Sequence, residues 1–450
     1  MEAESADLLV IGSGQGAVPL ASDYADAGRR VVLFERERLG GSCVNFGCTP
    51  TKAFLAAAHA AGRARLAGEL GIECEPHVDF PRLMERVRRI RDTGSRGVER
   101  TLSEKGVQIV RAEASFTETG AVTADGRSWS APVVVIDTGS RAAVPPIDGL
   151  DSVPYRTDRD IWALEELPPR LAVVGGGYIG LELGQGFARL GSRVDIFEQN
   201  ERILATEAAD VAEVLRESLQ RDGVRVREDT AVESVRHEEG VFRLQAGGEE
   251  HAADALLLAV GRVPNTGALN AERAGVELDD RGSIRIDARM KARDGIYAIG
   301  EAAGQPAFTH VAWEDYRRLR AVLEGGDRRR DDRVLGYAVF TEPQVGRAGL
   351  SADQARDRGH QLRLAEMQVA QMARGVEWGH DLGFYRLVFD AASDRLLGAE
   401  LIGYEAAEIV HVLIDLIETG GTAAQLGAWQ HIHPTYAENL PSLARKARAS

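Results

Sequence analysis

The sequence predicts an α/β fold with two Rossmann-like dinucleotide-binding domains and a C-terminal α+β domain. Two segments, 7–36 and 171–198, each read as a strand, a glycine-rich turn, a helix and a second strand that ends in an acid. In the last quarter of the chain, strand patterns alternate with amphipathic helices, as at 384–389, 397–402 and 405–419. A chain of 450 residues is long enough for two to three domains, each with its own core.

The first unit has the features of a dinucleotide-binding βαβ segment. The strand 8–11 runs into Gly12-Ser13-Gly14-Gln15-Gly16-Ala17, and the strand 30–35 ends at Glu35. Gly12 allows the tight turn, and Gly14 lets a pyrophosphate approach the N-terminus of the following helix. Glu35 would accept a hydrogen bond from a ribose hydroxyl. Because strand, helix and acid accompany the glycines, the pattern is a specific signal.

The second unit repeats this pattern. The strand 171–174 leads into Gly175-Gly176-Gly177-Tyr178-Ile179-Gly180, and the second strand ends at Glu198. A carboxylate at this position binds the 2′-hydroxyl of NAD and repels the 2′-phosphate of NADP. The sequence therefore favours NAD, with the nearby Arg202 as the residue that could reverse this preference. The glycines expected to shape this turn are Gly175, Gly177 and Gly180.

The expected domain boundaries follow from these two units. Pro145-Pro146 opens a linker after the first unit, and the strand-like segment 295–301 is expected to rejoin the first domain. The charged stretch 328–333 reads as a solvated linker. The predicted domains are 1–145 and 263–325 for the two parts of the first nucleotide-binding domain, 146–262 for the second, and 333–450 for the last.

Two of the three cysteines, Cys43 and Cys48, lie about thirty residues after the first glycine-rich turn and indicate redox chemistry. Residues i and i+5 of a regular helix point in different directions, so a bridge between these sulfurs requires a distorted helix start. Asn45, Gly47 and Pro50 permit such a distortion. Two other readings stay open, namely unrelated buried thiols or half of a zinc site. The zinc reading is weak because metal sites favour closer spacing and a second ligand pair.

Two further residues near this motif carry expectations of their own. Cys74 stands alone and is expected to be a small core residue. Lys52 is one of only four lysines in a chain with 54 basic residues, and it follows Cys48 by four positions. Because lysine is a compact point charge and arginine a planar fork, we expect Lys52 to occupy a site where that difference matters.

Composition limits the classes of partner. The formal net charge of −15 argues against nucleic acid or an anionic membrane as the main partner. No apolar run is long enough to cross a bilayer, and the acidic N-terminus is unlike a signal peptide. We therefore expect a cytoplasmic enzyme in a reducing compartment, with no bound metal.

With these motifs in this order, the chain resembles the class I pyridine nucleotide-disulfide oxidoreductases, which include dihydrolipoyl dehydrogenase, glutathione reductase and mercuric reductase. The resemblance covers essentially the whole sequence. It implies FAD at the first turn, NADH at the second, and a C-terminal dimerisation domain, so that two subunits of a homodimer share each active site. The motifs that carry it are the Gly12 turn, Gly40–Lys52, Thr138-Gly139, the Gly175 turn, Gly261–Asn265, Gly300-Glu301, and His431–Thr435 with Glu438.

The resemblance assigns roles to the matching residues. Cys48 would be the thiolate against the flavin, and Cys43 the thiol that attacks the substrate. His433, held by Glu438, would be the acid-base group supplied by the other subunit, since a thiol needs a base to become a nucleophile.

The remaining roles concern the cofactors. Lys52 would lie near flavin N5 and pair with Glu182, while the ring of Tyr178 would cover the nicotinamide pocket. Glu301 stands where the family has an aspartate for the ribityl chain, so a shift of about one methylene and a lower flavin affinity are expected. Other cofactor-binding positions that the resemblance implies are Ser42, Thr138, Gly139 and Gly261.

These observations predict an FAD-dependent NADH:disulfide oxidoreductase of the dihydrolipoyl dehydrogenase type. The alternative is a metal-ion reductase for Hg(II) or Cu(II), because Pro50–Lys52 and 308–317 look closer to the mercuric-reductase-like and reactive-chlorine-resistance branch. We expect neither the C-terminal cysteine pair nor the N-terminal metal-carrier domain of mercuric reductases. A redox sensor without turnover is a third reading, which the second nucleotide turn and His433 oppose.

Overall fold

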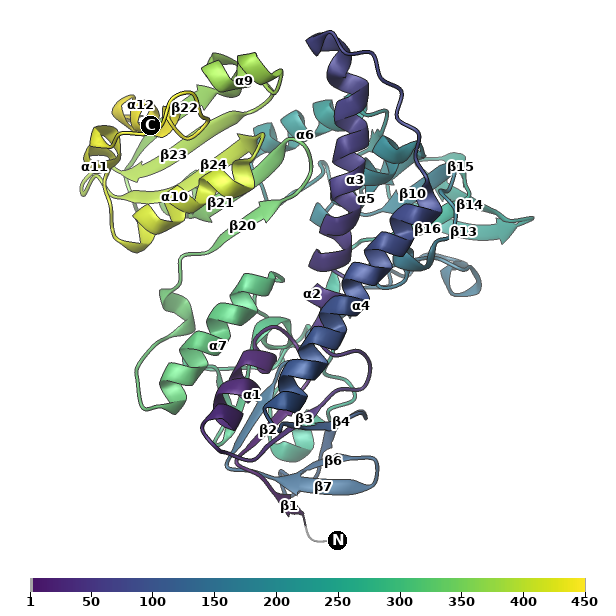
Figure 1. Ribbon diagram of the computed structural model, residues 1–450, viewed down its shortest axis with the longest axis vertical. Helices are drawn as coiled ribbons and strands as arrows, with labels where there is room; N and C mark the ends of the chain where they lie inside the picture. The colour runs from purple at the N-terminus through teal and green to yellow at the C-terminus, as the bar shows by residue number, and fades with distance from the viewer. Residues whose placement is uncertain (1–2, 450) are drawn as a thin grey trace.

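The computed structural model describes residues 3–449 as three sheet-based units joined by a long central helix (Figure 1). The first unit has a six-stranded sheet in the order β18-β19-β8-β2-β3-β4, parallel except for the edge pair β18 and β19. Its strands are β2 (Leu8–Ile11), β3 (Val31–Phe34), β4 (Gln108–Val110), β8 (Val133–Ile136), β18 (Lys291–Arg293) and β19 (Ile296–Ala298). Because β19 pairs with β8, the chain returns to this sheet after the second unit.

Both faces of this sheet are covered, as the continuous apolar strands require. Three helices pack on one face, and a small four-stranded sheet packs on the other, with Trp129 edge-on to Phe34 at 5.1 Å between ring centroids. The helices are α1 (Ala17–Asp26), α4 (Phe80–Glu104) and α7 (Thr309–Leu323). The small sheet contains β1 (Glu4–Ser5), β5 (Ser115–Phe116), β6 (Val122–Ala124) and β7 (Arg127–Ser130).

The second unit has a parallel sheet in the order β12-β11-β10-β16, flanked by α5 and α6 and by an antiparallel three-stranded sheet. A short pair, β9 (Ser140–Ala142) with β17 (Arg262–Pro264), joins the two units. The elements are β10 (Arg170–Val174), β11 (Arg193–Phe197), β12 (Arg225–Arg227), β16 (Ala255–Leu258), α5 (Tyr178–Leu190), α6 (Ala209–Arg221), and the smaller sheet β13 (Val232–Glu238), β14 (Val241–Ala246) and β15 (Glu249–Ala253).

The third unit is a six-stranded antiparallel sheet in the order β20-β21-β24-β23-β22-β25, with α10 (Ala406–Glu418) on one face. With this unit the predicted fold class, two Rossmann-like domains followed by an α+β domain, is confirmed. The strands are β20 (Gly336–Val339), β21 (Gln344–Gly349), β22 (Leu362–Gln368), β23 (Phe384–Asp390), β24 (Leu396–Gly403) and β25 (Arg448–Ala449). The short helices are α8 (Ala352–Asp357), α9 (Ala373–Trp378), α11 (Ala423–Ala428) and α12 (Asn439–Arg445).

The central helix α3 (Cys48–Leu66) packs against both α4 and α5, and thus contacts both nucleotide-binding units (Figure 1). Phe54 of α3 lies 4.8 Å from Phe187 of α5 between ring centroids. The ring of Phe54 fits over Gly186, where an added Cβ would lie 2.7 Å from it. This close packing fixes the helix that begins at Cys48 relative to the second nucleotide turn.

Two expectations about single segments differ from the structure. Cys74 is exposed and not a core residue, because it lies in the irregular segment between the 3₁₀ turn Ala67–Leu70 and α4. The charged stretch 328–333 is mostly solvated, but Arg333 turns inward and pairs with the buried Asp315 at 2.6 Å. Among the helices of residues 3–449, none has both the length and the apolar composition that a bilayer crossing needs.

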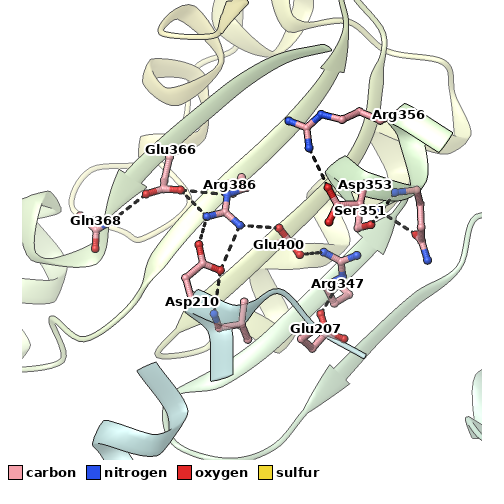
Figure 2. A network of polar contacts seen from close by, with 12 residues as sticks. Glu207, Asp210, Arg347, Ser351, Asp353, Arg356, Glu366, Gln368, Arg386 and Glu400 are labelled. Atoms are coloured by element: carbon pink, nitrogen blue, oxygen red, sulfur yellow. Dashed lines mark hydrogen bonds and ion pairs between the residues drawn. The ribbon is translucent and has the colours of Figure 1, made fainter. Parts of the chain in front are cut away.

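A row of charged side chains joins the second and third units (Figure 2). Arg347, Glu400, Arg386 and Glu366 come from four adjacent strands, and each faces the next directly across the sheet. The row lies on the face opposite α10, since neighbouring Gly346 faces that helix. Two acids of the second unit dock on it, Glu207 on Arg347 and Asp210 on Arg386.

We expect Glu400→Ala to destabilise this junction strongly. Glu400 is 2% exposed and bridges the buried Arg347 and the half-buried Arg386, so its removal leaves both cations short of a partner, which costs about 3 kcal/mol. The matched control is Glu366→Ala, which also removes a partner of Arg386, but one whose side chain is 41% exposed; about 1 kcal/mol or less is expected. Urea unfolding midpoints measure both losses, and equal losses would contradict the assignment.

Candidate active site

Two adjoining cavities contain most of the residues that the sequence singled out. The first begins at the Gly12 turn and extends past Glu35 to the cysteine segment. The second, of about 570 Å³, lies between α3, α5, α7 and the third unit. The residues that line both cavities, and so mark their junction, are Ser42, Cys43, Glu301, Phe308 and Thr309.

The first glycine-rich turn is shaped by close backbone packing. Gly12 has φ +97° and lies against the carbonyl of Asp137. A Cβ at Gly14 would lie 2.5 Å from the Asp137 carboxylate, so only glycine fits. Glu35 accepts hydrogen bonds from the Ser13 hydroxyl at 2.6 Å and the Ser13 amide at 3.2 Å.

The second turn has the same arrangement. Gly175 has φ +112°, and Glu198 accepts from the amides of Gly176 at 2.7 Å and Asn200 at 2.8 Å. Arg202 points away from Glu198 and donates to the main-chain carbonyls of Ala205 and Glu207. The carboxylate at Glu198 therefore has no arginine partner from this direction. The other glycines named from the sequence complete the turn and its surroundings: Gly177 precedes α5, Gly180 packs on the carbonyl of Gly175, and Gly261 has φ +126°.

The cysteine segment contains the distortion that the spacing predicted. Cys43 lies in α2 (Gly41–Asn45), and the helix breaks before α3 begins at Cys48. The buried amide of Asn45 holds the break by donating to the carbonyls of Leu39 at 2.9 Å and Gly41 at 3.0 Å. Both thiols are free in this structure, and each shifts the pKa of the other.

The two thiols differ in their electrostatic surroundings. The hydrogen bond from Cys43 lowers the pKa of Cys48, and Thr309 and Lys52 act in the same direction. The Sγ atom of Cys48 lies 3.1 Å from the Thr309 hydroxyl. The same interaction, together with burial, raises the pKa of Cys43. These interactions favour the thiolate form of Cys48 and the protonated form of Cys43.

Lys52 and Glu182, expected to pair, lie 2.7 Å apart between Nζ and Oε2. Lys52 is one helical turn beyond Cys48, on the same face of α3. Glu182, which is 2% exposed, also accepts from the Phe340 amide at 2.9 Å. The Phe340 ring lies 4.3 Å from the Lys52 ammonium. Three units of the fold thus fix the position of this one cation.

Aromatic rings form one wall of the second cavity. Tyr178 lies 5.8 Å from Phe308, which stacks on Tyr337 at 4.9 Å with 10° between the ring planes. The Tyr337 hydroxyl donates to the buried Glu207. Tyr337 was not singled out from the sequence, and Thr309 was named only as part of the segment 308–317, because nothing in their local sequence indicates that their side chains reach this site.

The acid at Glu301 is engaged on the protein side of the junction. It accepts from Arg262 at 3.0 Å and from the Ser140 hydroxyl, and Arg262 also pairs with Asp158 at 2.6 Å. Asp158 was not singled out from the sequence, and Arg262 was named only as part of the motif Gly261–Asn265. Nearby, Thr138 has a buried hydroxyl that finds no hydrogen-bond partner within residues 3–449, and Gly139 has φ +62°. The glycine cradle and this unpaired hydroxyl fit an extended dinucleotide in the first cavity.

His433 and Glu438 form a dyad, with Nδ1 of His433 2.8 Å from Oε2 of Glu438. The His433 side chain is 72% exposed and lines neither cavity, so its own chain does not bring it to the cysteines. The carboxylate on Nδ1 orients the ring so that Nε2 faces outward.

Comparison with known proteins places the whole chain. The family described as "Pyridine nucleotide-disulphide oxidoreductase" matches residues 6–315, and its dimerisation domain matches residues 336–444. Dihydrolipoyl dehydrogenase of Haloferax volcanii is 33% identical over 99% of this chain and 97% of its own length. Mercuric reductase of Acidithiobacillus ferrooxidans is also 33% identical, over 97% of this chain and 82% of its own length.

Solved structures agree with this placement. The HOCl-induced flavoprotein disulfide reductase RclA from Escherichia coli has a TM-score of 0.89 at 30% identity, covering 98% of this chain and 99% of that one. Its Cu(II) complex has a TM-score of 0.90 at 29% identity, with 99% of each chain covered. The chain therefore belongs to the pyridine nucleotide-disulphide oxidoreductase family, as a flavoprotein disulfide oxidoreductase of the dihydrolipoyl dehydrogenase and mercuric reductase class with Cys43 and Cys48 as its redox pair.

Proposed function

We propose that this chain is an FAD-dependent, NADH-linked enzyme that reduces a small disulfide, with dihydrolipoyl-type compounds as the first candidates. The observation that carries the proposal is the thiol pair at the helix break. One thiol has a lowered pKa and the other a raised pKa, and they lie where the two cavities adjoin. Such an asymmetric pair suits stepwise thiol–disulfide exchange.

The two turns would hold the two nucleotides. When bound, FAD supplies two-electron transfer between a nicotinamide and a disulfide. Lys52, fixed by Glu182, keeps a positive charge beside the Cys48 thiolate. The residues proposed to bind FAD are Gly12, Gly14, Glu35, Ser42, Lys52, Thr138, Gly139 and Glu301, and those proposed for NADH are Gly175, Gly177, Tyr178, Gly180, Glu182, Glu198 and Gly261.

The substrate half of the reaction requires a base, because Cys43 holds its proton. His433 of the partner subunit would take that proton, and the Cys43 thiolate would attack one sulfur of the substrate disulfide. The released thiolate would receive the proton back from the imidazolium. Cys48 would then attack the Cys43 sulfur, which releases the second substrate thiolate and leaves a Cys43–Cys48 disulfide.

Reduction of a metal ion is the second candidate, supported by the likeness to RclA, of which a Cu(II) complex has been solved. A soft ion held by two thiolates needs no proton donor. Within residues 3–449, however, no group of three or more histidine, cysteine or acidic side chains is placed to hold a metal. If the substrate were a metal ion, the oriented His433–Glu438 dyad would have no proton to transfer. We therefore favour a disulfide as the substrate.

The first test concerns the two thiols. Cys43→Ser should lower disulfide turnover by about a thousandfold or more but keep a thiolate–flavin charge-transfer band at long wavelength. Cys48→Ser should abolish that band in the half-reduced enzyme. Visible spectra during titration with NADH and steady-state rates measure both effects. Full disulfide reductase activity in either variant would show that the pair is not the redox centre.

The nicotinamide preference gives a second test. The Glu198 carboxylate, which has no arginine partner among residues 3–449, should disfavour the 2′-phosphate of NADPH by roughly tenfold or more, at about 1.4 kcal/mol per decade. We expect kcat/KM to be higher with NADH than with NADPH. Glu198→Gln keeps a hydrogen-bond acceptor but removes the charge, so it should bring the kcat/KM values for NADH and NADPH closer together. Equal efficiency of the two nucleotides in the wild type would show that another cation overrides Glu198.

A third test asks what His433 does and which subunit it serves. His433→Ala should lower disulfide turnover by about a hundredfold to ten-thousandfold but leave any Hg(II) or Cu(II) turnover nearly unchanged. Separate Cys43→Ser and His433→Ala dimers should be poor, whereas mixing them with subunit exchange should restore one good site per heterodimer. Absence of recovery despite demonstrated exchange would favour a site built within one chain. Efficient metal turnover by the wild type, with none of any disulfide, would reverse the choice of substrate.

A further inference from the structure

Asp137 is a buried carboxylate directly beneath the first glycine-rich turn. It follows β8, is 5% exposed, and its Oδ2 accepts from the amide of Ala17, the first residue of α1, at 2.8 Å. It lines the first cavity, and Gly14 packs on its carboxylate with no room for a Cβ. The carboxylate thus occupies the N-terminus of the helix at which a pyrophosphate would bind.

The charged groups that face Asp137 are also acids. Asp315 from α7 and Glu301 from the turn after β19 both act on it. Asp315 has Arg333 as its cation, and Glu301 has Arg262. Among residues 3–449, no ion pair joins Asp137 itself to an arginine or lysine.

This environment disfavours the ionised form. Burial is the largest cause, and the two neighbouring acids add to it, so the pKa of Asp137 is raised from 3.8 to about 7 despite the amides of Ala17 and Gly16. Unlike Asp315 and Glu301, Asp137 relies on main-chain amides alone to stabilise a charge. The same end of α1 is the part of the turn that would meet the negative charges of a dinucleotide.

We propose that Asp137 binds FAD in its protonated form, so that flavin binding above neutral pH takes up one proton. An ionised Asp137 would repel the pyrophosphate through the thin layer of the Gly14 backbone and compete with it for the positive end of α1. A neutral Asp137 keeps an oxygen that accepts from Ala17 and adds no charge. This inference rests on the FAD site of the proposed function.

The direction of the pH dependence follows from proton linkage. Bound pyrophosphate raises the pKa of Asp137 further above its value in the flavin-free protein, so affinity falls as pH rises through about 7. The limiting slope is one decade per pH unit, and affinity is constant below the pKa of the flavin-free protein. The flavin-free protein should also become less stable as pH rises from 3.8 through about 7. The reason is that the Asp137 carboxyl has a lower pKa in the unfolded chain than in the folded protein.

The test is a titration of the flavin-free, full-length protein with FAD, followed by flavin fluorescence from about pH 6 to about pH 9. The dissociation constant of the wild type should rise about tenfold or more between about pH 7 and about pH 9. Asp137→Asn, which keeps an acceptor for Ala17 but cannot ionise, should bind FAD with no such rise. Glu113→Gln is the matched control: Glu113 lines the same cavity but is exposed and pairs with Arg36, so its removal should leave the slope unchanged.

Calorimetry provides a second readout that needs no variant. Titration with FAD at about pH 8, in buffers of different ionisation enthalpy, should give an uptake approaching one proton per FAD. An uptake of zero, or an unchanged slope in Asp137→Asn, would overturn the inference, and so would loss of the slope in Glu113→Gln. If Asp137→Asn does not fold, the wild-type proton count decides. Failure to bind FAD at any pH would overturn the proposed function as well, whereas FAD binding without proton uptake would overturn this inference alone.

Discussion

The active site depends on the break between α2 and α3, which lets the Cys43 and Cys48 thiols meet. In a continuous helix these side chains would point apart, and the pair would not exist. Asn45 stabilises the break by donating hydrogen bonds to the carbonyls of Leu39 and Gly41. Because α3 begins at Cys48 and packs on α4 and α5, the position of this thiol is set by the cores of both nucleotide-binding units.

The same helix explains how one site can serve two nucleotides. Cys48 and Lys52 lie one turn apart on α3, while Tyr178 and Glu182 lie one turn apart on α5. The contact between the two helices brings these pairs to a common cavity. The helix α5 begins directly after the second glycine-rich turn, and α3 follows the cysteine segment that lines the cavity of the first turn. The third unit completes the wall through Phe340, whose amide binds Glu182.

The sequence predicts the helices and strands whose patterns are local, but not the contacts that depend on tertiary packing. The strand expected at 8–11 has the bounds of β2, and the helix expected at 405–419 exceeds α10 by one residue at each end. Both elements follow from the pattern of apolar residues within the segment itself. Thr309 and Tyr337 reach the site only because α7 and β20 fold back onto it, which no local pattern encodes. Cys74 was expected in the core from its residue type alone. The segment around it contains no helix or strand that could pack the side chain against the core, so Cys74 is exposed.

The use of cations shows the same division between framework and chemistry. At the junctions between units, arginine binds several acceptors at once: Arg386 joins Asp210, Glu366 and Glu400 in one fork. The planar guanidinium group of arginine fixes the geometry of its partners, but its positive charge is spread over the whole plane. Lys52, one of four lysines, meets a single carboxylate and places one compact charge beside the Cys48 thiolate. An arginine at this position would spread its charge over a larger plane and would need a second acceptor. The compact charge that a neighbouring thiolate requires therefore explains why a lysine stands here in a chain that otherwise uses arginine almost throughout.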